Sequence, residues 1–264
     1  MELTVKDTKA YAYTGGRPCD PALPAVVFIH GAANDHSVWN LQTRWFAHHG
    51  FCVLAPDLPG HGRSAGPLLA TVEAQADWLL ALLDAAGVAQ AALVGHSMGS
   101  LIALEAAARL PQRVTKIALV GTAVPMPVSD ALLAAARDDR ARAEGMVNLW
   151  SHGPRGALGG NRQPGHWLMG AGLRLMQRAA PGVLFNDLSA CNDYQRGAEA
   201  ATALRCPALL VVGSRDLMTS PRGAAKLAAS MADARTAVIE GCGHALMAEY
   251  PDAVLDALRG FMGS

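Results

Sequence analysis

The sequence has few charged residues and no excess of either sign. Charged side chains make up 17% of the 264 residues, and 22 Lys and Arg balance 22 Asp and Glu. A chain with no net charge and no run of like charges has no electrostatic attraction for nucleic acid or for an anionic membrane. We therefore expect neither nucleic acid nor a membrane among its partners.

Cysteine patterns typical of a disulfide framework or a zinc site are also missing. The five cysteines are Cys19, Cys52, Cys191, Cys206 and Cys242, an odd number without a C-x-x-C pair. Such scattered cysteines predict free thiols, which suit a reducing compartment. The first residues include no apolar stretch of signal-peptide length, and the longest apolar runs are too short to cross a membrane. These absences favour a cytoplasmic protein.

What the sequence does have is a regular alternation of short apolar runs with segments of helical length. Hydrophobic residues make up 51% of the chain, which suits one substantial core. Because the runs are continuously apolar, they predict strands buried on both faces in a parallel sheet flanked by helices. The predicted strands cover residues 25–30, 51–55, 91–95, 116–120, 208–212 and 236–240. The predicted helices cover residues 37–49, 70–86, 97–110, 221–231 and 246–262. Residues 3–5 and 9–13 should add an antiparallel edge.

The alternation stops between residues 123 and 195. Two stretches there, 124–127 and 153–160, are rich in proline or glycine, and helical pieces lie between them. No parallel strand is indicated. We expect residues 1–122 and 196–264 to form the core of a single domain, and residues 123–195 to form a helical cap over one end of its sheet.

The strongest motif is Gly-His-Ser-Met-Gly at residues 95–99, between a predicted strand and a predicted helix. This G-x-S-x-G pattern is typical of a sharp turn that exposes a nucleophilic serine, here Ser97. The turn is so tight that Gly95 and Gly99 are needed to avoid clashes with neighbouring backbone. Ser97 would also lie at a helix N-terminus, where the helix dipole favours developing negative charge. We expect Ser97 to be a catalytic nucleophile.

A serine hydroxyl needs a base to remove its proton near neutral pH. His244 follows the last predicted strand in a glycine-containing loop and is the expected base. Asp216 follows the preceding strand and is the expected acid that orients His244, with Asp187 and Asp193 near the cap as alternatives. Serine, aspartate and histidine in this chain order, each at the end of a strand, are typical of a catalytic triad on an α/β sheet.

The tetrahedral intermediate of such a reaction needs N–H donors for its oxyanion. The N–H of Met98, directly after the nucleophile, is one expected donor. The loop after the strand at residues 25–30 should supply the other, which we assign to the N–H of Ala32. These two groups form the predicted oxyanion hole.

Together these motifs resemble the α/β-hydrolase superfamily over nearly all of the chain outside the cap. The matching positions are His30-Gly31, the segment DLPGHGRS at 57–64, the turn at Ser97, Asp216 and Gly243-His244. The resemblance implies a mostly parallel eight-stranded sheet, hydrolysis through an acyl-enzyme, and no metal or organic cofactor. We expect a small-molecule ester as substrate and a monomer or homodimer as the assembly.

The same resemblance narrows the reaction. Serine at position 97 disfavours haloalkane dehalogenases and epoxide hydrolases, which use a carboxylate there. Carbon–carbon hydrolases usually have tryptophan after the catalytic histidine, and this chain has Ala245 there. Proline iminopeptidases usually have tryptophan after the nucleophile, and this chain has Met98 there. Both reactions are therefore disfavoured. A carboxylesterase-like serine hydrolase is therefore expected. Two alternatives stay open: thioester, lactone or perhydrolase chemistry on the same triad, and a small-molecule receptor without turnover.

The cap should carry much of the substrate specificity. Aromatic and apolar side chains commonly line small-molecule pockets. The candidate substrate contacts are Met126, Trp150, Trp167 and Leu246.

Overall fold

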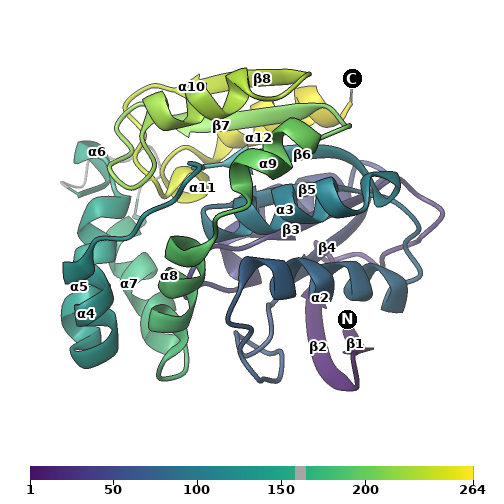
Figure 1. Cartoon of the computed structure of the whole chain (residues 1–264). Helices are drawn as coiled ribbons and strands as arrows, with labels where there is room; N and C mark the ends of the chain where they lie inside the picture. The colour runs from purple at the N-terminus through teal and green to yellow at the C-terminus, as the bar shows by residue number, and fades with distance from the viewer. Residues whose placement is uncertain (158–164, 264) are drawn as a thin grey trace.

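The computed structural model describes residues 1–157 and 165–263 and is built around an eight-stranded sheet. The strand order is β1-β2-β4-β3-β5-β6-β7-β8, antiparallel at β1-β2 and β2-β4 and parallel elsewhere (Figure 1). The strands are β1 (Glu2–Val5), β2 (Thr8–Tyr13), β3 (Ala25–Ile29), β4 (Cys52–Pro56), β5 (Ala91–His96), β6 (Val114–Val120), β7 (Ala208–Gly213) and β8 (Ala234–Ile239). The predicted mostly parallel sheet with an antiparallel edge is confirmed.

Helices cover both faces of the sheet. On one face lie α2 (Val72–Ala85), α3 (Met98–Arg109), α9 (Gly197–Ala203) and α10 (Pro221–Ala229). On the other face lie α1 (Asn40–Ala47), α11 (Leu246–Glu249) and α12 (Pro251–Met262), with the 3-10 turn η1 (His36–Trp39) before α1. A second 3-10 turn, η2 (Pro111–Arg113), leads into β6. No helix among the described residues is both long enough and apolar enough to cross a membrane.

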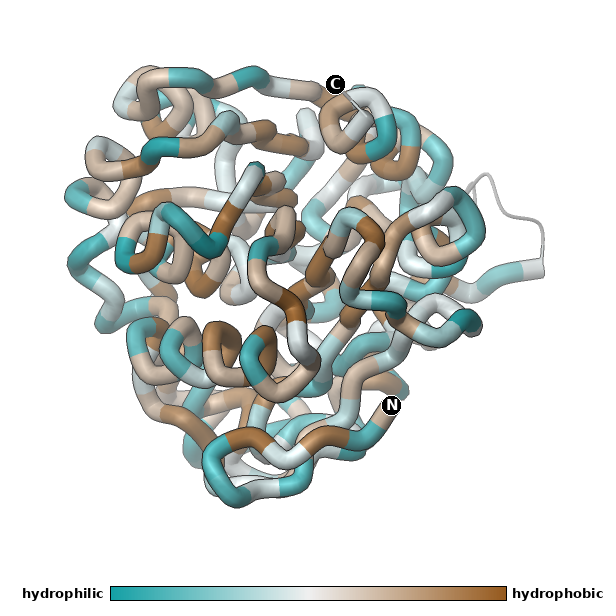
Figure 2. Tube along the Cα trace, turned by 90° about the vertical axis from the view of Figure 1, so that its right-hand side faces the viewer, coloured by the Kyte–Doolittle hydropathy of each residue, from teal (hydrophilic) through white to brown (hydrophobic). Residues whose placement is uncertain are grey.

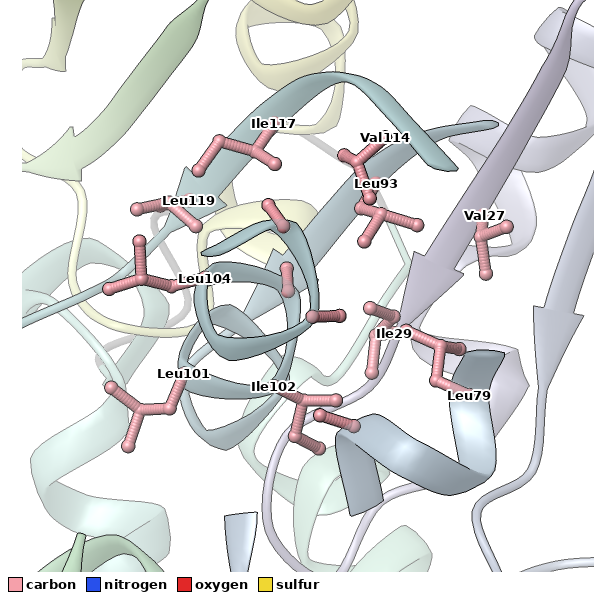
Figure 3. Close-up of a cluster of buried hydrophobic side chains, with 14 of the residues drawn as sticks. Val27, Ile29, Leu79, Leu93, Leu101, Ile102, Leu104, Val114, Ile117 and Leu119 are labelled. Carbon is pink, nitrogen blue, oxygen red and sulfur yellow. The ribbon is translucent and has the colours of Figure 1, made fainter. Parts of the chain in front are cut away.

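The core follows from the two-residue period of the strands. Val27 and Ile29 of β3 point to the face covered by α2 and α3, where they join Leu101 and Ile102 of α3 (Figure 3). Phe28, one residue out of phase, packs on the opposite face against the rings of η1 and α1. Each such fully buried side chain stabilises the fold by about 1.5–3 kcal/mol relative to an exposed one. The hydrophobic stretches accordingly gather inside the molecule (Figure 2).

Between β6 and α9 the described residues form helices and no strand. These are α4 (Asp130–Asp138), α5 (Arg140–Ser151), α6 (Pro154–Ala157), α7 (Leu168–Arg178) and α8 (Val183–Asp193). Helices α4, α5, α7 and α8 gather at one end of the sheet (Figure 1). They share a small core of their own that includes Leu132, Met176 and Leu188. We call residues 123–195 the helical segment; part of its glycine-rich stretch 153–160 lies outside the described residues.

Two predicted helices are interrupted in the structure. The segment predicted as one helix over 246–262 is divided into α11 and α12 at Tyr250, because Pro251 has no N–H to continue the first helix. Proline is instead well placed as the first residue of α12. The segment predicted over 37–49 starts as the 3-10 turn η1, capped by the Asp35 carboxylate on Ser37 N–H, before α1 begins.

The prediction of free thiols is wrong for two of the five cysteines. Cys19 and Cys52 form a disulfide, with their Cα atoms 4.4 Å apart, whereas Cys191, Cys206 and Cys242 are free. Cys19 lies in the loop before β3, and Cys52 begins β4, the strand beside it. The pair is brought together by sheet topology, which the spacing of the cysteines does not reveal.

Candidate active site

The turn at Ser97 has the strained geometry that its glycines predict. Ser97 connects β5 to α3 with φ 53° and ψ −119°, a conformation rare for a residue with a side chain. A Cβ on Gly95 would overlap the carbonyl group of Gly99. A Cβ on Gly99 would lie 2.6 Å from the carbonyl oxygen of His30. Both glycines are therefore required for α3 to begin directly behind the strand.

His244 and Asp216 form a buried pair at the ends of neighbouring strands. The Nδ1 atom of His244 is 2.8 Å from Oδ2 of Asp216, and both side chains are at most 5% exposed. Oδ1 of Asp216 accepts N–H groups from Met218 and Thr219, each at 2.8 Å, and the Thr219 hydroxyl donates to Oδ2 at 2.6 Å. Burial opposes ionisation of Asp216, but His244 and the Thr219 donors outweigh it and hold the pKa of the carboxyl below its usual value.

The ring of His244 is packed against two residues of neighbouring strand ends. A Cβ on Gly121, which follows β6, would lie 3.1 Å from Nδ1 of His244 and would crowd the ring, and the φ of 58° at this position also favours glycine. His96 is also next to the ring, with its own ring centroid 4.8 Å away, and its Nε2 is 2.9 Å from the carbonyl oxygen of His244. Burial and the neighbouring His244 lower the pKa of His96 to about 3, which favours its neutral form near pH 7.

A buried glutamate fixes the loop that carries His244. Oε1 of Glu249 accepts the N–H of Gly243 at 3.0 Å, and Oε2 accepts the N–H of Gly153 in the helical segment at 2.8 Å. The backbone of the two regions is joined again where Ala245 N–H donates to Ser151 O at 2.8 Å. Burial raises the pKa of Glu249. Glu249 was not predicted from the sequence, because the groups it bonds lie on loops far from one another in the chain.

Ser97 and His244 line the same cavity, which has a volume of about 890 Å³. This size is within the usual range for a small-molecule site. The walls between the sheet and the helical segment are mostly apolar. They include Val128, Leu132, Val147, Leu168, Leu175, Leu184, Leu188 and Met247.

Two of the four predicted substrate contacts line this cavity, and two do not. Met126 and Trp150 are on its wall. Trp167 is 76% exposed and lies outside the lining, although His166 and Leu168 on either side of it contribute. Leu246 is fully buried in the core next to Gly121 and is also absent from the lining. The structure therefore does not bring Trp167 and Leu246 to this cavity, because position in the chain does not show which way a side chain points.

The loop after β3 lies against the turn at Ser97. A Cβ on Gly31 would be 3.1 Å from Cβ of Ser97, and the next residue, Ala32, lines the cavity. Met98 is the first residue of α3, where a helix leaves N–H groups without a partner in the helix. Within residues 1–157 and 165–263, neither Ala32 N–H nor Met98 N–H donates to a protein acceptor. Both groups are thus available to a bound ligand.

Asp187 and Asp193, the alternative acids, do not bond His244 and have other partners. Asp187 is fully buried and pairs with His61, whose Nε2 is 2.8 Å from Oδ2 of Asp187. Asp193 is exposed and accepts a hydrogen bond from Asn192. Asp216 is therefore the carboxylate bonded to His244. The pair of His61 and Asp187 was not predicted, because its members are 126 positions apart.

One cluster of side chains has the composition of a metal site. Asp35, His36 and Asp57 bring three potential ligand atoms within 4.8 Å of one another. Protein donors already occupy them: Asp57 accepts from N–H and Nδ1 of His36 and from Arg63 N–H. Asp35 accepts from the Ser37 N–H and from Arg178. The cluster holds the loop that follows β4 in place, and we assign it no ion.

Comparison with known proteins agrees with this architecture. A family model described as the alpha/beta hydrolase fold matches residues 24–251. The chain belongs to the α/β-hydrolase family. This α/β-hydrolase is 31% identical to the pimeloyl-(acyl-carrier protein) methyl ester esterase of Aromatoleum aromaticum, over 90% of this chain and 99% of that protein.

Solved structures of the family have the same fold over the whole chain. The enol-lactonase of Burkholderia xenovorans superimposes with a TM-score of 0.88 at 23% identity, covering 100% of both chains. The esterase EaEST of Exiguobacterium antarcticum gives a TM-score of 0.87 at 19% identity, covering 100% of this α/β-hydrolase and 99% of the esterase. At these identities the likeness concerns the fold.

Proposed function

We propose that this α/β-hydrolase is a serine esterase that cleaves carboxylic esters through an acyl-enzyme. The observation that carries the proposal is that His244, which lines the same cavity as Ser97, is bonded behind the cavity wall to the buried carboxylate of Asp216. A serine, a histidine and a carboxylate with a perturbed pKa that bonds the histidine are the groups that an acyl-transfer site requires. The esterase of A. aromaticum supports an ester as substrate.

Each side chain has a step to perform. Because Nδ1 of His244 is bonded to Asp216, it keeps its proton, and Nε2 is left to act as the base. Nε2 removes the proton of Ser97 as Oγ attacks the ester carbonyl carbon. The negative charge on the carbonyl oxygen is then stabilised by the N–H groups of Ala32 and Met98. Protonated His244 gives the proton to the leaving alcohol, and water hydrolyses the acyl-enzyme by the same route.

The cavity favours an ester with a sizeable apolar acyl or alcohol part. Its apolar walls come from the sheet end and from the helical segment, which we propose to act as the cap of the site. Thioesters, lactones and peracid formation would use the same triad. A panel of esters, thioesters and lactones matched in acyl chain ranks these reactions by kcat/KM, and we expect a carboxylic ester to rank first.

The nucleophile is tested by labelling with a fluorophosphonate probe together with hydrolysis of short p-nitrophenyl esters. We expect wild-type protein to be labelled and to turn over, and Ser97→Ala to lose both. Ser230→Ala is the matched control, because Ser230 lies at the C-terminal end of α10, outside the lining of this cavity, and its hydroxyl donates to Leu227 O. It should keep labelling and turnover near wild-type values.

Two results would contradict the proposal. Labelling that persists in folded Ser97→Ala would assign the nucleophile to another residue. Folded wild-type protein that is neither labelled nor active on any member of the panel would favour a binding protein on the same fold.

A further inference from the structure

Asp187 reaches from the helical segment into the loop that carries the proposed oxyanion donor. It lies on α8, is fully buried, and its Oδ2 accepts the N–H of Ala33 at 2.9 Å while also bonding Nε2 of His61 at 2.8 Å. Its Oδ1 accepts from Asn186 at 3.1 Å. A buried carboxylate with three donors is a rigid anchor. It joins α8 to two loops of the sheet, those that follow β3 and β4.

The contacts of His61 show that this anchor is an ion pair. Nδ1 of His61 lies 3.1 Å from Pro59 O, and Nε2 faces Asp187. Both partners are acceptors, so both ring nitrogens must donate and the ring carries a positive charge. The side chains are at most 2% exposed. Burial opposes the charged ring, but the carboxylate of Asp187 outweighs it and raises the pKa of His61.

Stability alone does not account for such a pair. A buried ion pair loses hydration on folding, and well-packed apolar residues often replace one without loss of stability. What apolar residues cannot do is accept an N–H. Ala33 has φ 52°, a left-handed conformation that is unfavourable for alanine, and Asp187 holds the N–H of that residue. At the other end of the turn, Asn34 N–H donates to Gly31 O at 3.3 Å.

We propose that Asp187 is a positioning residue for ester hydrolysis, which fixes the turn at Ala32 and Ala33 so that Ala32 N–H faces the oxyanion. The inference rests on the function proposed above. It assigns Asp187 no contact with substrate, since Asp187 is absent from the cavity lining. With this role for Asp187, stabilisation of the oxyanion depends on the position of α8, because the carboxylate belongs to that helix. Substrate binding at the apolar walls and the rate of the chemical step would thereby be coupled.

The test compares binding of a tetrahedral adduct with binding of a ground-state analogue. A trifluoromethyl ketone forms an oxyanion on a catalytic serine, whereas the methyl ketone with the same chain serves as the ground-state analogue. Asp187→Asn preserves side-chain volume but removes the charge, and Asp187→Ala removes the acceptor altogether. Asp193→Asn, an exposed carboxylate on the same helix, is the matched control. Turnover is expressed per active site titrated with fluorophosphonate, so unfolded molecules do not enter the comparison.

We expect kcat to fall at least about 10-fold in Asp187→Asn and further in Asp187→Ala, toward the 10²–10³-fold that loss of one oxyanion donor typically costs. KM and the Ki of the methyl ketone should stay within about twofold, while the Ki of the trifluoromethyl ketone should rise by the factor by which kcat/KM falls. Asp193→Asn should match wild type in every measurement.

Different results overturn different statements. Wild-type kcat per titrated site in both Asp187 variants, or equal weakening of both ketones, would overturn the positioning role and leave the esterase proposal intact. Wild-type protein that binds both ketones equally and turns over no ester would overturn the proposed function, and this inference with it.

Discussion

Replacement of Asp216 by asparagine should almost abolish turnover while leaving the fold intact, and the structure gives the reason. Oδ1 of Asp216 accepts two backbone N–H groups, from Met218 and Thr219. An asparagine must place its oxygen there, since the reverse orientation would leave two buried donors without acceptors, at about 1–3 kcal/mol each. Its NH₂ group is then directed at Nδ1 of His244. That nitrogen must become an acceptor, so the proton of the neutral ring moves to Nε2.

A histidine protonated at Nε2 cannot remove the proton of Ser97. The expected loss in kcat is about 10⁴-fold, which corresponds to about 5 kcal/mol in the barrier. We would measure kcat on a p-nitrophenyl ester with titrated active sites and thermal unfolding by circular dichroism. Asp256→Asn, in an exposed ion pair with Arg259, is the control for the chemical change itself. Activity of Asp216→Asn within 10-fold of wild type, in folded protein, would refute the argument from the tautomer.

Two further predictions concern stability. Burial lowers the pKa of His30 to about 4 and of His96 to about 3, so below pH 6.5 the unfolded chain binds protons that the folded chain does not. The free energy of unfolding should therefore fall between pH 7 and pH 5, by about 2 kcal/mol for each of these histidines. His61 acts in the opposite direction, because its pKa is raised: its stabilising contribution is fully present below pH 6.5 and is lost only as the pH rises. Urea midpoints that are equal or higher at pH 5 would contradict this. Gly99→Ala should prevent folding or lower the melting temperature strongly, because its Cβ would lie 2.6 Å from a backbone oxygen. Gly145→Ala, in open space on α5, should instead raise the free energy of unfolding by about 0.5–1 kcal/mol. Melting curves in which the two variants behave alike would refute the role of the tight turn.

The sheet and the tight turn at Ser97, the proposed nucleophile, could be predicted because both depend on local features of the sequence. Continuous apolar runs indicate strands with two buried faces, and the glycines on either side of Ser97 are needed by the backbone of that turn. His244 and Asp216 follow from the same logic, since the ends of neighbouring parallel strands meet at one edge of the sheet. The break of the last helix could also have been predicted, because Pro251 is a local signal for the start of a new helix. It was missed because the apolar residues keep a helical period on both sides of the break.

Contacts between the helical segment and the sheet could not be predicted in this way. The bond between Asp187 and His61 joins positions that share no motif, and it forms because α8 packs at the end of the sheet next to the loop that carries His61 (Figure 1). The direction of Trp167 and the closeness of Cys19 to Cys52 likewise depend on how separate segments pack. Neither propensity nor spacing contains this information, because it arises from three-dimensional packing.

The helical segment contacts both halves of the proposed catalytic machinery. At one end Asp187 bonds Ala33 next to the proposed oxyanion donor, and at the other Ser151 O accepts from Ala245 beside the proposed base. Glu249 adds a second bond to the same region through Gly153 N–H. A segment that only covered a pocket would not need buried hydrogen bonds to these loops, since apolar packing would close it. Exchange of this segment for that of a relative should therefore alter kcat as well as substrate preference, unless the donors and acceptors at both ends are kept.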